Sequence, residues 1–333
     1  MPSDVKELAL PWGVTEVGDL AFNDCKSITN IVLPNTLTTI GSTAFAFCSN
    51  LKTINLPKGL KIIDMAAFMG CSSLTNIILP NTLTTIGSTA FAGCVNLQEI
   101  NIPDSVTTLE GAFMGCSNLR KVKLPKSLSK IENDMFNECS LTEIDLPEGL
   151  TSIGDGAFNS CSLTKVDIPS SVETIGNYAF GNNKLTSVTL SSTIDYGENV
   201  FSGNYEVTSV TIPEGIIKIP NGIINGCSKV IKVVIPSTVT TIGFTAFCGC
   251  AGLTEIVIPS NVTTIETAAF AGTSNLKNVY IEGTTCNIQD SAFAEIASDT
   301  TIYVRSDSVA TALTNSGYEG TIVNNTTWVA PKQ

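Results

Sequence analysis

The chain has 333 residues, of which 43% are apolar and only 14% are charged, and its formal net charge is −12. This negative charge disfavours nucleic acids and acidic membrane surfaces as partners, because like charges repel. The sequence has no apolar run of about 18 residues that could cross a bilayer and no basic amphipathic stretch that could lie on one. We therefore expect no membrane insertion.

The N-terminal residues 1–7 lack the apolar segment of a secretory signal, which favours either a leaderless protein or a chain whose leader has been removed. Val5, Leu8 and Leu10 already read as a repeat strand, with no capping element before them. An uncapped edge of a parallel sheet invites pairing. The sequence therefore predicts either further chain upstream or dimerisation through this edge.

From there a repeat runs along nearly the whole chain, with the consensus L-x-x-I-x-L-P-x-x-L-T-x-I-G-x-x-A-F-x-x-C-x-x. Its phenylalanine column recurs every 21 to 23 residues, with Ile224 filling one place, at Phe22, Phe45, Phe68, Phe91, Phe113, Phe136, Phe158, Phe180, Phe201, Phe247, Phe270 and Phe293. A proline column stands at Pro11, Pro34, Pro57, Pro80, Pro103, Pro125, Pro147, Pro169, Pro213, Pro236 and Pro259. A cysteine column follows the phenylalanines by three residues at Cys25, Cys48, Cys71, Cys94, Cys116, Cys139, Cys161, Cys227 and Cys250.

One unit predicts three short elements. Ile54 and Leu56 alternate with polar residues, which is typical of a strand with one buried face, and Pro57 ends it. The segment 37–41 predicts a second short strand, closed by a glycine that permits a tight or left-handed bend. The i, i+3 spacing of Phe45 and Cys48 predicts one helical or 3₁₀ turn. Since one unit buries too little to be stable alone, we expect the units to stack and the main strands to form one parallel ladder.

The last segment, 306–333, predicts a C-terminal cap followed by a loose tail. Ser306 or Asp307 is a suitable N-cap for a short helix through Val309 and Leu313, which Gly317 would end. The predicted organisation is thus one solenoid over residues 1–305, with thirteen A-F-x-x-C units, and a cap over 306–333.

These motifs resemble the BspA-like, Treponema-type leucine-rich repeats of bacterial and protist surface proteins. Phe45 with Cys48, Pro57 and Gly87 match the family pattern, and the match covers about residues 5 to 305. The resemblance implies an α/β-type repeat solenoid, a right-handed superhelix with a parallel sheet on its concave side and short strands and turns on its convex side. It also implies surface display and adhesive binding to host proteins or other cells. The pattern weakens where the cysteine or the proline is replaced, at Asn183, Asn204, Thr273, Ile296, Ser191 and Glu282.

The cysteines are predicted to be small buried core residues. Neighbours in the column lie within disulfide range, but in a parallel stack their Cβ vectors run parallel instead of converging, which disfavours bonding. Cys248 is the thiol that we expect to be most exposed. The chain contains no histidine and no C-x-x-C, so we predict no metal site, no cofactor and no enzyme, although pairs of carboxylates remain an alternative.

The outward side chains of the main strands are the candidate partner-binding residues. One candidate is a charged ladder, in which Glu99, Lys121, Glu143 and Lys165 alternate in sign and would be cross-strand neighbours. Their companions on the same strands are Lys123, Asp145 and Asp167. The alternative is a surface ladder whose charges simply satisfy one another.

The second candidate is an apolar strip formed by Val234, Val257, Tyr280 and Tyr303, since aromatic residues dominate binding hot spots. The alternative is that the C-terminal segment folds over this strip. The sequence therefore predicts a non-enzymatic protein-binding module, either a surface or secreted adhesin that binds host or extracellular-matrix proteins through its concave face, or an intracellular scaffold.

Overall fold

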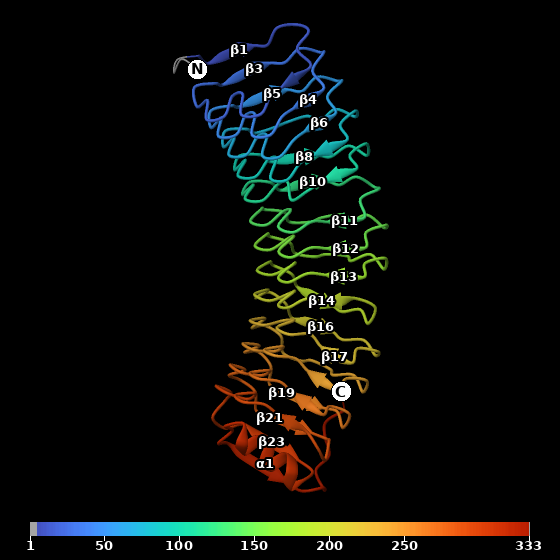
Figure 1. The fold of residues 1–333 in the computed structure, drawn as a ribbon. Coiled ribbons are helices and arrows are strands. Elements are labelled where there is room, and N and C mark those ends of the chain that lie inside the picture. Colours follow the sequence, from blue (N-terminus) through green and yellow to red (C-terminus); the bar gives the residue numbers. More distant parts are fainter. Residues whose placement is uncertain (1–4, 333) are drawn as a thin grey trace. The chain divides into compact units, whose positions relative to one another are not determined.

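The computed structural model describes residues 5–332, in two compact units that divide between Val172 and Glu173. Each unit is a stack of coils, and each coil contributes short strands that run parallel to those of the next coil (Figure 1). The parallel-strand repeat solenoid predicted from the sequence is confirmed, with little helix.

In the first unit, the main strands form two short ladders. The first ladder runs in the order β1 (Glu7–Ala9), β3 (Asn30–Val32) and β5 (Thr53–Asn55). The second joins β8 (Glu99–Asn101) to β10 (Lys121–Lys123). The central residue of each strand faces the core, as Ile54 does at 4% exposure. Strand β1 pairs with β3 on one of its edges. The dimerisation predicted through the N-terminal edge of the sheet stays a prediction.

The second strands of this unit are shorter but better connected. The five-stranded ladder is formed by β2 (Glu16–Val17), β4 (Thr39–Ile40), β6 (Ile62–Ile63), β7 (Thr85–Ile86) and β9 (Thr108–Leu109). A further pair joins β11 (Lys130–Ile131) to β12 (Ser152–Ile153).

The second unit has the same organisation. Its main strands are β14 (Ser187–Thr189) with β16 (Ser209–Thr211), and the ladder β19 (Glu255–Ile258), β21 (Asn278–Ile281), β23 (Thr301–Val304) and β24 (Thr321–Asn324). Its second strands are β13 (Thr174–Ile175) with β15 (Asp195–Tyr196), and the ladder β17 (Lys218–Ile219), β18 (Thr241–Ile242), β20 (Thr264–Ile265) and β22 (Asn287–Ile288).

The prediction of one continuous main ladder is wrong. The segments 76–78, 143–145, 165–167 and 232–234 occupy main-strand positions without forming strands. Nothing in the structure explains these four breaks. The chain before 143 and 165 is one residue shorter than in most units (Cys139 to Leu141, against Cys116 to Leu119), but it is equally short before β14, which does form.

The turn that carries each phenylalanine also differs from its prediction. The bond from the Cys48 N–H to the Phe45 carbonyl (3.2 Å) has the expected i, i+3 spacing. However, Thr43 and Phe47 have positive φ angles of 52° and 59°, so the segment is a series of turns with no helix. The same two positions are left-handed in every unit, from Leu20 and Asp24 to Ser291 and Glu295.

This conformation directs alternate N–H groups along the stack. Thr43, Phe45 and Phe47 donate to carbonyl oxygens of the next coil at 2.8, 2.8 and 2.7 Å. In a continuous helix, by contrast, backbone N–H groups beyond the first turn donate to carbonyl oxygens of the same helix and not to a neighbouring coil. The turns therefore hold neighbouring coils together in the way that the strands do.

The glycine that ends each second strand has a different role from the one predicted. Gly41 does not have a left-handed backbone, but a Cβ atom added to it would lie 2.6 Å from Asp19 Oδ1 and 2.8 Å from the carbonyl oxygen of Val17. The residue at this position must be small because two coils approach each other closely there.

The core is built from the predicted columns. The phenylalanine column is buried throughout, including Ile224, and its rings stack on one another at centroid distances of 5.2 to 5.7 Å within each unit. All the cysteines are free thiols, as predicted; Cys25 and Cys248 are half-buried and the others buried. Most thiols of the column also donate to the carbonyl oxygen of the phenylalanine one coil earlier, as Cys71 Sγ does to Phe45 at 3.1 Å.

The C-terminal segment begins as predicted and then departs from the prediction. Helix α1 (Asp307–Asn315) is capped by Ser306, whose side chain accepts the Val309 N–H at 3.2 Å, and Gly317 has a left-handed φ of 89° just after its end. The tail beyond it is not loose, because Thr321–Asn324 forms β24 and continues the main ladder beside β23. The boundary between a solenoid and a cap at residue 305 stays a prediction.

Candidate protein-binding surface

The strand face, defined as the outward-facing side chains of the main-strand positions, carries every residue that the sequence analysis singled out for binding. In the charged set, Glu99 and Lys121 are in register on β8 and β10, as predicted. Glu143 and Lys165 lie on segments that form no strand, so the predicted four-residue ladder is not continuous. Among the described residues, no ion pair joins neighbouring members of this set across coils.

The ion pair that does form in this set lies within one coil. Lys165 Nζ and Asp167 Oδ2 are 2.7 Å apart, and both side chains are largely exposed. Exposed pairs of this kind contribute little to stability. Lys123, Glu143 and Asp145 are exposed as well, so the charges are accessible to a partner.

The apolar strip is largely closed. Val257 is only 7% exposed, so the expectation that it would present an open binding surface is wrong. Tyr280 and Tyr303 stack on each other at 4.8 Å, and the Trp328 ring covers both at 5.7 and 6.2 Å. Val234 is exposed, at 42%.

The tail is fixed over the strip by polar contacts. Trp328 Nε1 donates to the Val304 carbonyl oxygen at 3.1 Å, and the Arg305 guanidinium lies 3.9 Å from the centre of the Trp328 ring. Arg305 Nη1 also donates to the Thr326 carbonyl oxygen at 3.2 Å. The structure thus has the arrangement that the sequence analysis named as the alternative, in which the C-terminal segment covers the strip.

Sequence reasoning missed an apolar surface on the strand face of the first unit. Val32 on β3 is 56% exposed, and Ile78, in a coil whose main strand does not form, is 77% exposed. Asn55 connects them, because it is the in-register neighbour of Val32 and lines one hollow with Ile78. Both apolar residues stand in the outward row that the sequence defines, but isolated aliphatic residues there gave no reason to rank them above two tyrosines.

The hollow beside Ile78, called here the Ile78 hollow, has a volume of about 600 Å³. Its apolar walls are Ile54, Leu56, Leu79 and Pro80, and its polar walls are Thr53, Asn55, Lys58, Asn76, Asn81 and Thr82. It lies where β5 has no strand partner in the next coil. A broken ladder has therefore opened an apolar recess with a polar border.

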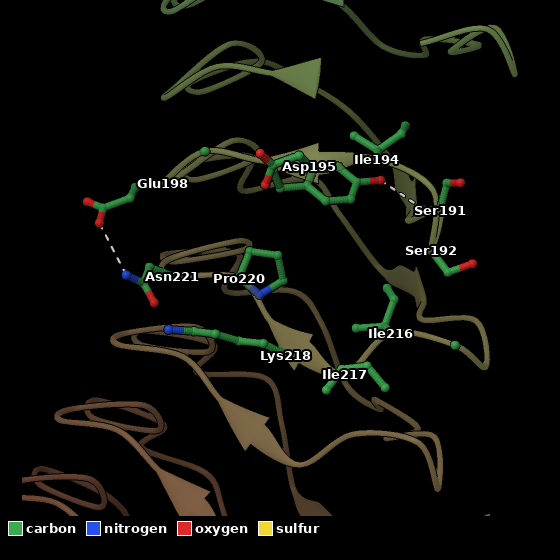
Figure 2. Close-up of a pocket in the computed structure, with 13 residues that line it drawn as sticks. Ser191, Ser192, Ile194, Asp195, Glu198, Ile216, Ile217, Lys218, Pro220 and Asn221 are labelled. Atoms are coloured by element: carbon green, nitrogen blue, oxygen red, sulfur yellow. Dashed lines mark hydrogen bonds between the residues drawn. The ribbon is translucent and has the colours of Figure 1, made fainter. Parts of the chain in front are cut away.

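A second hollow, of about 460 Å³, lies in the second unit between the coils of β15 and β17 (Figure 2). It opens on the side of the second strands and is lined by Asp195, Tyr196, Glu198, Lys218 and Pro220, among others. No motif in the sequence marked this place except the replacement of a column proline by Ser191.

Nothing in the site chemistry points to catalysis. The chain has no histidine, and in residues 5–332 no group of three histidine, cysteine or acidic side chains is placed to hold a metal ion. Burial raises the pKa of the fully buried thiols of the column, for example that of Cys116 to about 12, so these thiols are poor nucleophiles near neutral pH. No helix in the described part of the chain is long and apolar enough to cross a membrane.

Regular coils, a buried phenylalanine column and an exposed strand face together define a leucine-rich-repeat protein. A sequence profile of the BspA-type leucine-rich repeat region, six copies long, matches residues 2–119, 109–229 and 195–316. The chain belongs to the BspA-type leucine-rich repeat family. No curated protein matches the sequence.

Solved structures show the same fold. A leucine-rich repeat protein from Bacteroides ovatus is 27% identical with a TM-score of 0.82, over 95% of this chain and 91% of that one. A leucine-rich cell surface protein from Faecalibacterium prausnitzii is 27% identical with a TM-score of 0.56, over 83% and 87%. The pneumococcal vaccine antigen PcpA, at 19% identity and a TM-score of 0.68 over 97% and 90%, shares the fold.

Proposed function

We propose that this chain is a non-enzymatic protein-binding module and that it binds its partner through the strand face of the first unit. The observation that carries the proposal is Ile78, a large aliphatic side chain that is 77% exposed at the edge of a hollow of about 600 Å³. Exposing such a side chain to water is unfavourable, and apolar recesses with polar borders are typical of binding sites.

The surroundings of Ile78 support the proposal. Val32, a second exposed apolar side chain, lies beyond Asn55 on one side, and the charged residues Glu99, Lys121 and Lys123 follow on the other. Interfaces commonly combine an apolar centre with a charged rim, where the charges contribute specificity and association rate more than affinity. Further charged residues available to this rim are Glu143, Asp145, Lys165 and Asp167.

We propose further that the chain acts at the cell surface as an adhesin for host or extracellular-matrix proteins. The support comes from the family, and from the 27% identical Faecalibacterium prausnitzii relative, which is a cell surface protein. Val234, Tyr280 and Tyr303 are further candidate contact residues, and the two tyrosines are partly covered by Trp328.

The test is binding of the purified chain to immobilised collagen, laminin and fibronectin by surface plasmon resonance. Ile78→Ser should weaken binding to the matrix protein that the chain recognises by about tenfold or more, as loss of a central anchor does. Ile231→Ser is the matched control, because Ile231 is 64% exposed and lies in the other unit. Equal losses for both variants would contradict the site, and no binding to any matrix protein would contradict the adhesin.

A further inference from the structure

The hollow between β15 and β17 exists because the second-strand ladder is interrupted there. In regular coils the residue after the second strand donates its N–H to the preceding coil, as Gly197 does to Ile175 at 2.7 Å and Gly243 does to Ile219 at 3.0 Å. Pro220 occupies this position after β17 and has no N–H to donate. In the described part of the chain, no backbone hydrogen bond joins β15 to β17.

The opening is local to this side of the two coils. Their main strands, β14 and β16, pair in regular register, and the Asn199 N–H in the next turn donates to the Asn221 carbonyl oxygen at 2.9 Å. The two coils are thus hydrogen-bonded to each other at two places but not at the second strands.

The interruption leaves acceptors without donors. By the pattern of the other coils, the carbonyl oxygens of Ile194 and Tyr196 would accept bonds from the β17 coil, but no described group donates to either. Tyr196 itself is held in place, because its hydroxyl accepts the Ser191 N–H at 2.8 Å (Figure 2). The two carbonyl oxygens are therefore available to accept hydrogen bonds from a ligand that brings several N–H donors.

The charged side chains leave the hollow with excess negative charge. Lys218 begins β17 as Asp195 begins β15, so the two residues occupy equivalent positions on neighbouring coils. The Lys218 ammonium, however, lies 2.8 Å from Glu266 Oε1, two coils further on. Asp195 is exposed and has no ion-pair partner among the described residues. Glu198 adds a second carboxylate at the rim, where its Oε1 accepts a hydrogen bond from Asn221 Nδ2 at 3.1 Å.

The floor of the hollow is apolar. Ile194, Ile216, Ile217 and Pro220 line it, and Ile217 is 56% exposed. A ligand that fits both floor and rim has an aliphatic stem and a cationic end that carries many donors. Lysine and arginine side chains have such stems, but only a guanidinium offers five N–H donors in one plane, enough for a carboxylate and two carbonyl oxygens.

We propose that this hollow binds an arginine side chain of a protein partner. The stem lies against Ile216 and Ile217, and the guanidinium donates to the Asp195 carboxylate and to the free carbonyl oxygens of Ile194 and Tyr196. The net charge of −12 attracts basic partners to the chain over longer distances. The site is separate from the Ile78 hollow, so either can fail its test without the other.

The experiment is calorimetric titration of the full chain with the capped peptide Gly-Arg-Gly, and with the same peptide carrying citrulline or lysine in place of arginine. Citrulline keeps the shape of arginine but is neutral and has fewer donors, so it should bind about tenfold more weakly or not at all. The affinity of the lysine peptide should lie between those of the arginine and citrulline peptides. Equal binding of the citrulline peptide, or no binding of the arginine peptide at millimolar concentration, would overturn the proposal.

Two variants locate the site. Asp195→Asn should weaken binding of the arginine peptide by about tenfold, since the substitution removes the charged partner of a charge-assisted hydrogen bond. Asp290→Asn is the matched control, an exposed aspartate of the same unit that lies outside the hollow, and should bind as the parent chain does. Equal affinity of the Asp195→Asn variant and the parent chain would overturn the proposal.

Pro220→Gly tests the origin of the hollow. Glycine is the common residue at this position and restores the missing N–H, so the ladder should close and the peptide should no longer bind, while the melting temperature is retained or rises. A folded Pro220→Gly chain that binds the peptide as tightly as the parent would contradict the account. If that variant does not fold, the Asp195→Asn variant and the citrulline peptide still test whether the hollow binds arginine.

Discussion

The thiol of Cys48 donates to the backbone carbonyl oxygen of Phe22, which lies one coil earlier at 3.1 Å from the sulfur. The same bond recurs from Cys94 to Phe68 and from Cys250 to Ile224, at 3.2 and 3.4 Å. Where asparagine replaces the cysteine, Asn204 Nδ2 donates to the Phe180 carbonyl oxygen at 2.9 Å. At these positions the column side chain therefore meets a requirement for a hydrogen-bond donor to the preceding coil as well as for packing.

This requirement predicts an order of stability at Cys94. Cys94→Ser keeps a donor, whereas Cys94→Val fills the space but leaves the Phe68 carbonyl oxygen without its bond from the next coil. The valine variant should be the less stable by about 1 kcal/mol, the usual net contribution of one hydrogen bond. Urea unfolding of both variants measures the difference, and a more stable valine variant would show that the column is simply apolar.

The buried thiols also predict a loss of stability in alkali. Burial raises the pKa of Cys116 from its usual 9.0 to about 12 in the folded chain. Below pH 9 the thiol is protonated in both states. Between pH 9 and about 12 only the unfolded chain ionises, so the contribution of this thiol falls by about 1.4 kcal/mol per pH unit. The advantage of the parent over Cys116→Ser should shrink by that amount as pH rises, and a constant difference from pH 8 to 11 would contradict it.

The exposure of the thiols predicts which of them react with a thiol reagent. Cys25 and Cys248 are half-buried, and the remaining cysteines are buried. At pH 8 the native chain should therefore be labelled at these two positions alone, and at the others only after denaturant is added. Mass spectrometry of the labelled peptides identifies which cysteines have reacted. Rapid native labelling of Cys71 or Cys94 would mean that the coils open far more readily than their packing implies.

The contact of Trp328 with Tyr280 and Tyr303 predicts a structural role for these rings. Trp328→Ala should lower the free energy of unfolding by about 1 to 2 kcal/mol, since it removes ring contacts and the cation–π contact with Arg305. Trp12→Ala is the control, because Trp12 is 85% exposed, and should leave stability nearly unchanged. Equal melting curves for the two variants would show that the tail is not held on the strip.

Much of this architecture could be predicted because it repeats. The burial of Phe45, the free thiol of Cys48 and the helix cap at Ser306 each follow from a local pattern. The left-handed residues at Thr43 and Phe47 could not be predicted, because their conformation depends on hydrogen bonds to the next coil and not on their own propensity.

The candidate sites were harder to predict for a related reason. The ladder break beside Ile78 leaves no mark in the sequence, and the Trp328 cover over Tyr280 and Tyr303 depends on where the distant tail folds. The hollow beside Pro220 could have been found, since a proline at a position that normally donates an N–H predicts an interrupted ladder.

The most direct test of the proposed function is amide hydrogen exchange of the chain, measured with and without the matrix protein that it binds. If the strand face of the first unit is the interface, binding should slow exchange over residues 53–58 and 76–82, the two segments that contain the lining of the Ile78 hollow, and leave 278–304 unchanged. Slowed exchange confined to the second unit, or to the turns that carry the phenylalanines, would contradict the assignment of binding to this surface.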